Sequence, residues 1–413
     1  MSIDAKTFID SALARGITLW SGVPCSYLKP FINGTIDHDD VRYVGAANEG
    51  DAIAIASGAW FAGGLGVAMF QNSGLGNAVN PLTSLSMILK VPLLVICTWR
   101  GEPGGEKDEP QHALMGPITP TLFDSMQIPW ALFPTTEADV AAVLDRAIAH
   151  MTTTRTPFAL IMQKDAVSPT PLKSSPKKAP AHLVLPAPSW PSDVRPTRKA
   201  VLTAVQQATD DDDVLIATTG FTGRELYAIE DLPRQVYMVG SMGCAVSLGL
   251  GMAIAVERGE SAGSAALSTS ESLEGRVANP PHQAKRKRII VLDGDGALLM
   301  RLGALASAGF EAPPNLVHLL LDNEVHDSTG GQHTTSHAVD LAAVAAACGT
   351  REVHRVAGVV DVVAALAAHK AQPTHTFLHI KTAPGAAQDL PRPAVTPDDV
   401  ALRLRRHLEG RTA

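Results

Sequence analysis

Cysteines are few and dispersed in this sequence of 413 residues. The four are Cys25, Cys97, Cys244 and Cys348, and none belongs to a CxxC pair. This spacing gives no support to a zinc ribbon, an iron–sulfur cluster or a disulfide framework. Free thiols are typical of a reducing compartment, so we expect a cytoplasmic protein.

Long apolar runs and an excess of positive charge are also absent. No stretch is long enough to span a membrane, and the acidic, amphipathic N-terminal segment is unlike a signal peptide, so we expect no membrane association. The formal net charge of -7 gives nucleic-acid binding no overall electrostatic support. No GxGxxG joins a strand pattern to a helix pattern, which disfavours a non-catalytic, nucleotide-binding protein of Rossmann type.

What is present is a regular alternation of apolar runs and helical patterns in both halves of the chain. Apolar runs such as LGVAMFQN and RIIVLDG, separated by helical patterns, are typical of parallel sheets covered on both faces. The sequence therefore predicts an α/β fold with two doubly wound parallel-sheet domains. We place them at residues 1–167 and 197–388, followed by a helical tail at 389–413.

Two segments interrupt the alternation. Residues 168–196 contain eight prolines, so we expect an extended linker between the domains. Residues 258–288 are rich in Ser, Ala and Gly and end in a basic run, which predicts a surface insertion within the second domain.

The most specific local pattern is Gly294-Asp295-Gly296 at the end of the strand RIIVLD. A helix is expected over ALLMRLGALASAGF, and its first amides suit a phosphate. The next strand, NLVHLLL, leads to Asn323, 28 residues after Asp295. One helix and one strand separate these residues, so both are expected at the carboxyl edge of the sheet, where ligands bind. A GDG turn alone is common, but with the asparagine it offers the oxygen ligands that Mg²⁺ prefers.

This pattern resembles the cofactor-binding motif of the thiamine diphosphate-dependent enzymes. The resemblance implies thiamine diphosphate and Mg²⁺ as cofactors. It implies that the metal is held by Asp295, by Asn323 and by the backbone oxygen of Val325. The other cofactor contacts that it implies are Glu49, Met242, Gly243, Gly294, Gly296, Ala297 and His326.

The same family requires a glutamate in a separate, pyrimidine-binding domain, after a strand and at the start of a helix. Glu49 has this position in VRYVGAANEGDAIAIASGAW, although the helix dipole alone also favours an acid there. The resemblance implies that Glu49 is catalytic and shares a proton with the aminopyrimidine of the cofactor. Residues 71–81, QNSGLGNAVNP, are similar to the glycine-rich loop of that domain. Family members build the site from neighbouring subunits, which implies at least a homodimer.

Two domains joined by a linker alone resemble the small branch of the family whose members decarboxylate phosphonopyruvate or sulfopyruvate. A carboligase with a third, central domain is disfavoured. Segments 22–33, 100–116 and 322–336 favour phosphonopyruvate, so we expect a small anionic 2-keto acid as substrate. Arginine and lysine suit phosphonate contacts, although surface ion pairs or helix caps explain these residues about as well. The candidates for substrate binding are Ser26, where a helix is expected to begin, and Arg100, Lys107, Gln111 and His112.

Overall fold

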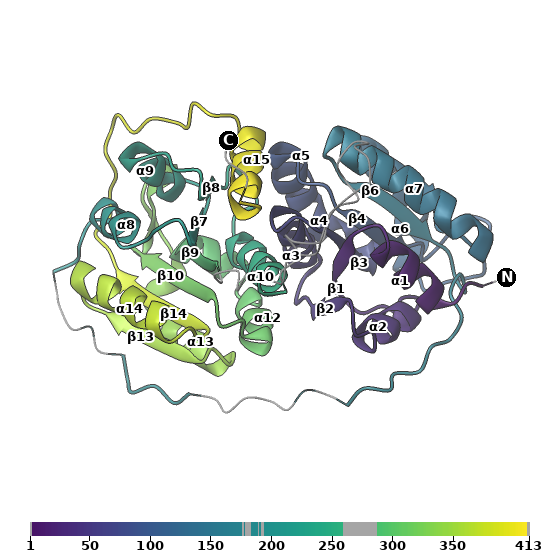
Figure 1. Ribbon diagram of the computed structural model, residues 1–413, viewed down its shortest axis with the longest axis horizontal. Coiled ribbons are helices and arrows are strands. Elements are labelled where there is room, and N and C mark those ends of the chain that lie inside the picture. The colour runs from purple at the N-terminus through teal and green to yellow at the C-terminus, as the bar shows by residue number, and fades with distance from the viewer. Residues whose placement is uncertain are drawn as a thin grey trace, which may run out of the picture.

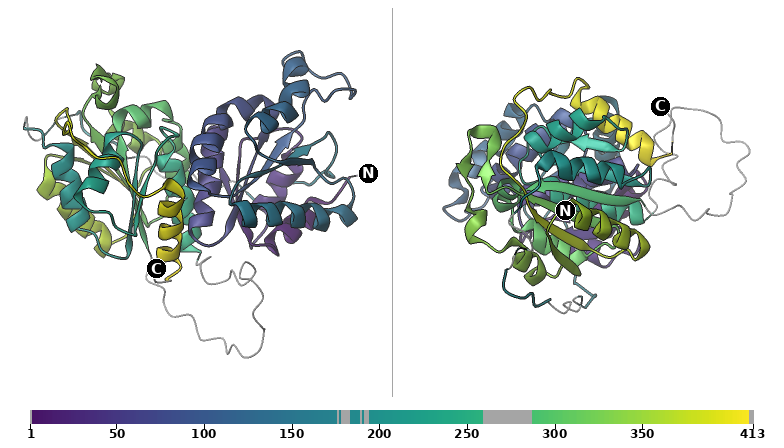
Figure 2. Two further views of the ribbon diagram at one scale, coloured as in Figure 1. Left: turned by 90° about the horizontal axis from the view of Figure 1, so that it is seen from above. Right: turned by 90° about the vertical axis from the view of Figure 1, so that its left-hand side faces the viewer.

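The computed structural model describes residues 2–175, 177, 183–188, 190, 194–258 and 287–410. In these residues it contains two six-stranded sheets, each made of parallel strands with helices on both faces (Figures 1 and 2). This architecture confirms the predicted α/β class and its parallel sheets. Within the described residues, no helix is long and apolar enough to cross a membrane.

The first sheet has the strand order β2-β1-β3-β4-β6-β5. Its strands are β1 (Ile17–Gly22), β2 (Arg42–Gly45), β3 (Leu65–Gln71), β4 (Leu94–Thr98), β5 (Trp130–Leu132) and β6 (Phe158–Met162). The α-helices around it are α1 (Ala5–Leu13), α2 (Lys29–Ile36), α3 (Glu49–Phe61), α4 (Leu75–Pro81), α5 (Met87–Leu89), α6 (His112–Ser125) and α7 (Glu137–Thr154).

The second sheet has the order β13-β14-β10-β9-β7-β8. Its strands are β7 (Asp213–Ala217), β8 (Gln235–Tyr237), β9 (Arg288–Gly294), β10 (Leu316–Asp322), β13 (Glu352–Val356) and β14 (Thr376–Lys381). Its helices are α8 (Arg198–Gln207), α9 (Phe221–Ile229), α10 (Ala245–Glu257), α11 (Asp295–Met300), α12 (Ala304–Glu311), α13 (Leu341–Ala347), α14 (Val359–Ala371) and α15 (Pro397–Leu408). Strands β11 (Val325–His326) and β12 (Gln332–His333) form a small antiparallel pair.

Both sheets have the same topology. When the strands of each sheet are numbered along the chain, both orders read 2-1-3-4-6-5. Such a sheet has a switch point between its first and third strands, where a crevice opens at the carboxyl ends. Each half therefore offers one crevice for a ligand.

The single helix expected over ALLMRLGALASAGF is wrong. The structure contains α11 and α12 instead, with a break at Arg301, whose φ of -138° and ψ of 49° are not helical. The edge strands β5 and β13 were also missed, because both are only partly buried and so lack a continuous apolar run. Of the insertion expected at 258–288, residues 259–286 lie outside the described part of the chain.

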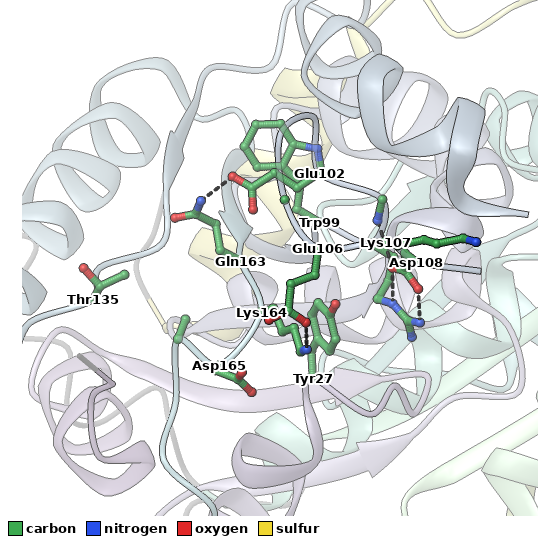
Figure 3. A pocket seen from close by; sticks show the side chains of 14 residues that line it. Tyr27, Trp99, Glu102, Glu106, Lys107, Asp108, Thr135, Gln163, Lys164 and Asp165 are labelled. Atoms are coloured by element: carbon green, nitrogen blue, oxygen red, sulfur yellow. Dashed lines mark hydrogen bonds and ion pairs between the residues drawn. The ribbon is translucent and has the colours of Figure 1, made fainter. Parts of the chain in front are cut away.

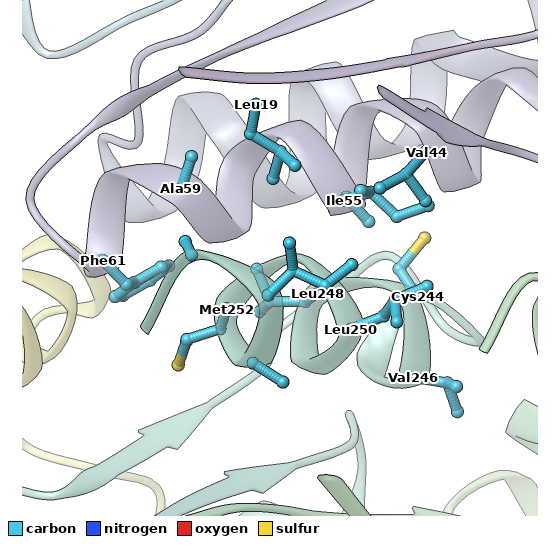
Figure 4. Close-up of a cluster of buried hydrophobic side chains, with 14 of the residues drawn as sticks. Leu19, Val44, Ile55, Ala59, Phe61, Cys244, Val246, Leu248, Leu250 and Met252 are labelled. Atoms are coloured by element: carbon cyan, nitrogen blue, oxygen red, sulfur yellow. The ribbon is translucent and has the colours of Figure 1, made fainter. Parts of the chain in front are cut away.

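The two halves pack against each other through α3 and α10, which are apolar and buried over most of their surface. Figure 4 shows α3 and α10 lying side by side, with Leu248 of α10 pointing toward α3. The helices approach closely because glycines lie at the crossing: a Cβ on Gly251 would come within 2.0 Å of a backbone oxygen of α3. This contact fixes how the two sheets face each other.

Candidate active site

The GDG motif and the asparagine meet at the edge of the second sheet. Strands β9 and β10 are neighbours, with Leu321 opposite Gly294. Asp295 is the first residue of α11, and Asn323 directly follows β10. One cavity is lined by eight of the residues that the resemblance implied for the cofactor and its metal, namely Met242, Gly294, Asp295, Gly296, Ala297, Asn323, Val325 and His326, whereas Gly243 is not part of its lining.

The same cavity has a wall that was not predicted from the sequence. It is formed by residues 218–222, which run from the end of β7 into the first turn of α9, at the switch point beside β9. Gly220 has a φ of 98° and is the N-cap of α9. The sequence signal is DVLIATTG, a strand that ends in threonines and a glycine before a helix. The first amides of α9 therefore belong to the set of groups available to a phosphate.

Asp295 is 2% exposed and has a polar shell of hydroxyl groups. Its Oδ2 accepts hydrogen bonds from Thr334 and, over 3.1 Å, from Oγ of Ser336. Burial raises the pKa of Asp295, against the effect of these hydrogen bonds. In the described part of the chain no Lys, Arg or His forms an ion pair with it. A buried carboxylate without a basic partner fits a bound cation, because buried charges in proteins are paired or coordinate metals.

The neighbouring acid, Asp322, has the opposite environment. It is fully buried and accepts hydrogen bonds from Nε2 of His379 over 2.8 Å and from Nζ of Lys381 over 2.7 Å. Burial opposes its ionisation, but these two donors lower the pKa of Asp322 to about 2. Oγ of Ser336 lies within hydrogen-bond distance of both Asp322 (2.9 Å) and Asp295 (3.1 Å), so its hydroxyl lies between the paired acid and the unpaired one.

Asn323 is oriented by a second acid. Its Nδ2 donates to Oδ2 of Asp327 over 2.7 Å. Asp327 in turn accepts from Nη1 of Arg198 over 3.1 Å and from the amide of Gly385. Arg198 is itself buried and paired with Glu225. Because Nδ2 is committed to Asp327, Oδ1 is the atom that this amide would offer to a metal ion.

Among the described residues, no group of three or more His, Cys, Asp or Glu is arranged to hold a metal ion. A magnesium ion in this cavity would therefore take a carboxylate oxygen, an amide oxygen, a backbone oxygen and oxygens of a bound phosphate. This mixed set of hard oxygen donors suits Mg²⁺. The residues present thus fit the cofactor and metal that the resemblance implied.

Glu49 lies at the other end of the candidate site. It is the first residue of α3, directly after Asn48, whose side chain caps the helix by accepting from the amide of Gly50. Nδ2 of Asn77 donates to Oε2 of Glu49 over 2.8 Å. A Cβ on Gly74 would lie 2.1 Å from Oε1 of Glu49. Residues 71–81, expected as a glycine-rich loop, instead form a 3₁₀ turn at 72–74 followed by α4. This segment holds the glutamate closely and depends on a glycine to do so.

A second cavity, of about 360 Å³, lies between the halves near Glu49. Its lining comes from the first half (Ala47, Asn48, Asp51, Asn77 and Asn80) and from the second (Met242, Met300, Arg301, Leu302 and Gly303). Met242 lines this cavity as well as the one beside Asp295. The two halves of one chain form this cavity between them, whereas the resemblance implied a site built from neighbouring subunits.

The positive groups predicted to bind substrate are paired with acids of their own loop. Arg100 donates from Nε to Asp108 over 2.7 Å and from Nη2 over 2.5 Å. These hydrogen bonds lower the pKa of Asp108 and raise that of Arg100. Arg100 and Asp108 line a cavity of about 480 Å³. Lys164 and Glu106 form a second ion pair in this cavity, beside Tyr27 (Figure 3). An anion entering here would compete with Asp108 and Glu106.

The remaining substrate candidates differ in exposure. Ser26 is exposed, with its Oγ 3.4 Å from Nη1 of Arg100, and Lys107 and Gln111 are exposed as well. His112 is buried under the loop, at 2% exposure. The expectation that a helix begins at Ser26 is wrong, because α2 begins at Lys29, and Pro30 occupies its first turn.

Comparison with known proteins agrees with this geometry. Residues 5–120 match the model of the thiamine pyrophosphate enzyme N-terminal TPP binding domain, and residues 218–380 match that of the C-terminal TPP binding domain. The structure resembles the crystal structure of benzoylformate decarboxylase from Polynucleobacter necessarius, with a TM-score of 0.68 and 12% identity, over 94% of this chain and 100% of that chain. The likeness at this low identity shows the fold.

Relatives of similar length narrow the class. The chain belongs to the thiamine pyrophosphate enzyme family. It is 43% identical to the phosphonopyruvate decarboxylase of Streptomyces viridochromogenes, over 98% of this chain and 94% of that protein. The corresponding protein of Streptomyces hygroscopicus is 42% identical over 98% and 93%. The sulfopyruvate decarboxylase of Methanosarcina acetivorans is 27% identical over 95% of each chain.

Proposed function

We propose that this protein catalyses the decarboxylation of 3-phosphonopyruvate to phosphonoacetaldehyde and CO₂, with thiamine diphosphate and Mg²⁺ as cofactors. The observation that carries the proposal is the 43% identity to a phosphonopyruvate decarboxylase over almost the full length of both chains. The cavity that joins Asp295, Asn323 and Met242 supports it independently.

The second half would hold the metal and the diphosphate. Asp295, Asn323 and the backbone oxygen of Val325 would bind Mg²⁺, and the first residues of α9 and α11 would face the phosphates. Met242 lines both cavities and is therefore placed to support the middle of the cofactor. When bound, the thiazolium ring accepts the electron pair that the departing CO₂ leaves behind.

Glu49 would share a proton with N1′ of the aminopyrimidine. Its carboxylate is held from one side by Asn77, and Gly74 allows the segment 71–81 to pass directly beside it. A general acid–base group of this kind contributes only when its position is fixed. The contacts of Glu49 with residues 74–77 supply that fixed position.

The substrate would be bound at the carboxyl edge of the first sheet. Arg100 follows β4, and Ser26 follows β1, so both lie at the edge of the sheet at which the chain leaves β3 toward α4. Two of the oxygens of a phosphonate can accept the paired N–H groups of one arginine. In the proposed complex it takes the place of the Asp108 carboxylate on Arg100. Lys107, Gln111 and His112 remain candidates for substrate contacts in the same segment.

Assembly and location are part of the proposal. Sulfopyruvate decarboxylase subunits beta of Methanothermobacter thermautotrophicus and alpha of Methanococcus maripaludis match 49% and 30% of this chain. Their names describe proteins that assemble from separate subunits, which favours a multi-chain enzyme here. We infer at least a homodimer and a cytoplasmic location.

Sulfopyruvate is the second candidate substrate, favoured by the 27% identity to a full-length sulfopyruvate decarboxylase. The test is aldehyde formation by the purified protein with thiamine diphosphate and Mg²⁺, measured separately with phosphonopyruvate, sulfopyruvate and pyruvate. We expect the highest kcat/KM for phosphonopyruvate. A higher value for sulfopyruvate would assign the enzyme to the sulfonate, and no aldehyde from any of the three would refute the proposed reaction.

A further inference from the structure

Arg301 crosses from one half of the molecule to the other. It lies at the break between α11 and α12, so it directly follows the short helix that begins at Asp295. Its Nη1 donates to Oδ1 of Asn48 in the first half over 2.6 Å. The two residues are 253 positions apart in the sequence. Arg301 therefore connects the GDG helix directly to the residue that precedes Glu49.

The groups that accept hydrogen bonds from Arg301 all lie around Glu49. Oδ1 of Asn48 also accepts from the amide of Gly50 over 2.8 Å and thereby caps α3, whose first residue is Glu49. Nη2 of Arg301 lies 3.5 Å from the backbone oxygen of Asn77. The side chain of Asn77 donates to Glu49 over 2.8 Å. One guanidinium thus contacts both supports of the glutamate.

A buried acid completes the contact. Nη1 of Arg301 lies 3.6 Å from Oδ1 of Asp51, which is 1% exposed. Ser247 of α10 donates to the same Oδ1 of Asp51 over 3.1 Å. Burial raises the pKa of Asp51 to about 6, and Arg301 acts against this rise. The arginine therefore neutralises an acid that belongs to the first half but is buried against the second.

The space around the guanidinium is narrow on both sides. A Cβ on Gly50 would come within 2.4 Å of the guanidinium nitrogens, and a Cβ on Gly243 within 3.0 Å of Cγ of Arg301. Gly50 belongs to the first half, and Gly243 follows Met242 in the second. The side chain thus passes between one glycine of each half, and it lines the cavity of about 360 Å³ between the two halves.

We propose that Arg301 is a positioning residue that sets the distance between Glu49 and the diphosphate-binding end of the site. It would act through Asn48 and Asn77 and would not touch the reacting atoms. A ligand that spans both halves then depends on Arg301, whereas a ligand that occupies only the second half does not. This inference rests on the proposed cofactor site.

Two ligands separate these cases. Thiamine diphosphate spans the site, and inorganic diphosphate represents only its phosphate end. Binding of each, with Mg²⁺, is measured by titration calorimetry on the full chain and on three variants. Arg301→Met removes the guanidinium. Arg301→Lys keeps a charge for Asp51 but has no planar fork with which to reach both Asn48 and Asn77.

The third variant, Arg355→Met, is the control. It breaks a pair with Asp340 in the second half, and the Arg355 side chain is 9% exposed, against 13% for Arg301. For Arg301→Met we expect thiamine diphosphate to bind at least about tenfold more weakly, since charge-assisted hydrogen bonds are lost. Inorganic diphosphate should bind within about twofold of wild type. Arg301→Lys should show a smaller loss in the same direction, and Arg355→Met should bind both ligands normally.

Two results would overturn the proposal: unchanged binding of thiamine diphosphate in both Arg301 variants, or an equal loss for both ligands, which would indicate local damage to α11. If Arg301→Met does not fold, Arg301→Lys alone decides, by whether it weakens binding of thiamine diphosphate more than binding of inorganic diphosphate. A wild-type protein that binds no thiamine diphosphate would instead refute the proposed cofactor site itself.

Discussion

Nδ2 of Asn323 donates a hydrogen bond to Oδ2 of Asp327 over 2.7 Å. The acceptor is fixed in turn by Arg198 and by the amide of Gly385. This chain of contacts decides which way the Asn323 amide faces, and therefore which of its atoms is presented to a metal ion. Groups that orient metal ligands are commonly as important for affinity as the ligands themselves.

Asp327→Ala should therefore weaken metal binding without removing a metal ligand. We expect the Mg²⁺ concentration for half-maximal thiamine diphosphate binding to rise about 10- to 100-fold, the usual range for such outer contacts. The measurement is thermal stabilisation by thiamine diphosphate over a Mg²⁺ series. Asp231→Ala is a suitable control, because it removes another arginine-paired acid, the partner of Arg403, that does not line the cavity. An unchanged Mg²⁺ requirement in Asp327→Ala would contradict the orienting role.

Glu49→Gln should abolish turnover while thiamine diphosphate still binds, because the amide keeps the shape of the side chain but cannot share a proton in the same way. Decarboxylation rates and cofactor titrations on the same preparation check this. Turnover close to that of wild type would exclude Glu49 as the catalytic group.

Gly74→Ala should cause much of the loss of turnover that is expected for Glu49→Gln. The added Cβ would lie 2.1 Å from Oε1 of Glu49, so the carboxylate must move. Gly76→Ala, two residues further along and within α4, is the matched control, since nothing lies within 4 Å of its added Cβ. We expect kcat to fall at least about tenfold in Gly74→Ala, as for a misplaced acid–base group, and to stay near wild type in Gly76→Ala. Equal rates for the two variants would show that this segment does not position Glu49.

Substitutions of Arg100 and Asp108 test whether the substrate binds at this ion pair. Arg100→Lys loses the bidentate fork, so KM for phosphonopyruvate should rise about tenfold with little change in kcat. Asp108→Asn weakens the competing pair and should lower KM. Steady-state kinetics with both variants provide the comparison. If neither substitution changes KM, the phosphonate does not bind at Arg100.

Because His375 is buried, we expect the protein to lose stability in mild acid. Burial lowers the pKa of His375 to about 3, whereas an unfolded histidine titrates near 6.5. Below that value the unfolded chain binds a proton that the folded protein does not, so stability is full above about pH 6.5 and falls between there and about pH 3. At pH 5 the cost is roughly 2 kcal/mol.

Urea unfolding of wild type and His375→Gln at pH 7 and pH 5 checks this. The variant should lose about 2 kcal/mol less between the two pH values. His354→Gln is the control, because the His354 side chain is 49% exposed. Identical pH dependence in wild type and His375→Gln would show that His375 is not buried in its neutral form.

The sequence was most informative where two short patterns are joined by one crossover. Consecutive parallel strands are commonly neighbours in a sheet, and β9 and β10 do pair directly, so the proximity of Asp295 and Asn323 followed from their spacing. The α/β class followed from buried apolar runs in the same way. Burial of His112 and the pairing of Arg100 with Asp108 did not follow, because both depend on how the loop folds back on itself.

The contacts between the halves were beyond the reach of sequence reasoning. Arg301 was expected inside a helix, and its guanidinium instead reaches Asn48, 253 residues away. Hydrophobic periodicity in the sequence does not predict a contact between two residues so far apart. Asp327 was missed for a related reason: its role becomes visible only when Arg198 and Gly385, from distant segments, converge on it.

The most direct test of the account is reconstitution of phosphonopyruvate decarboxylation. The protein is stripped with a chelator and dialysed, and phosphonoacetaldehyde is measured after addition of thiamine diphosphate, of Mg²⁺, or of both. We predict turnover only when both are present, and none for Asp295→Ala under the conditions that saturate wild type. Aldehyde formation without thiamine diphosphate, or an Asp295→Ala variant with wild-type Mg²⁺ dependence, would contradict the account.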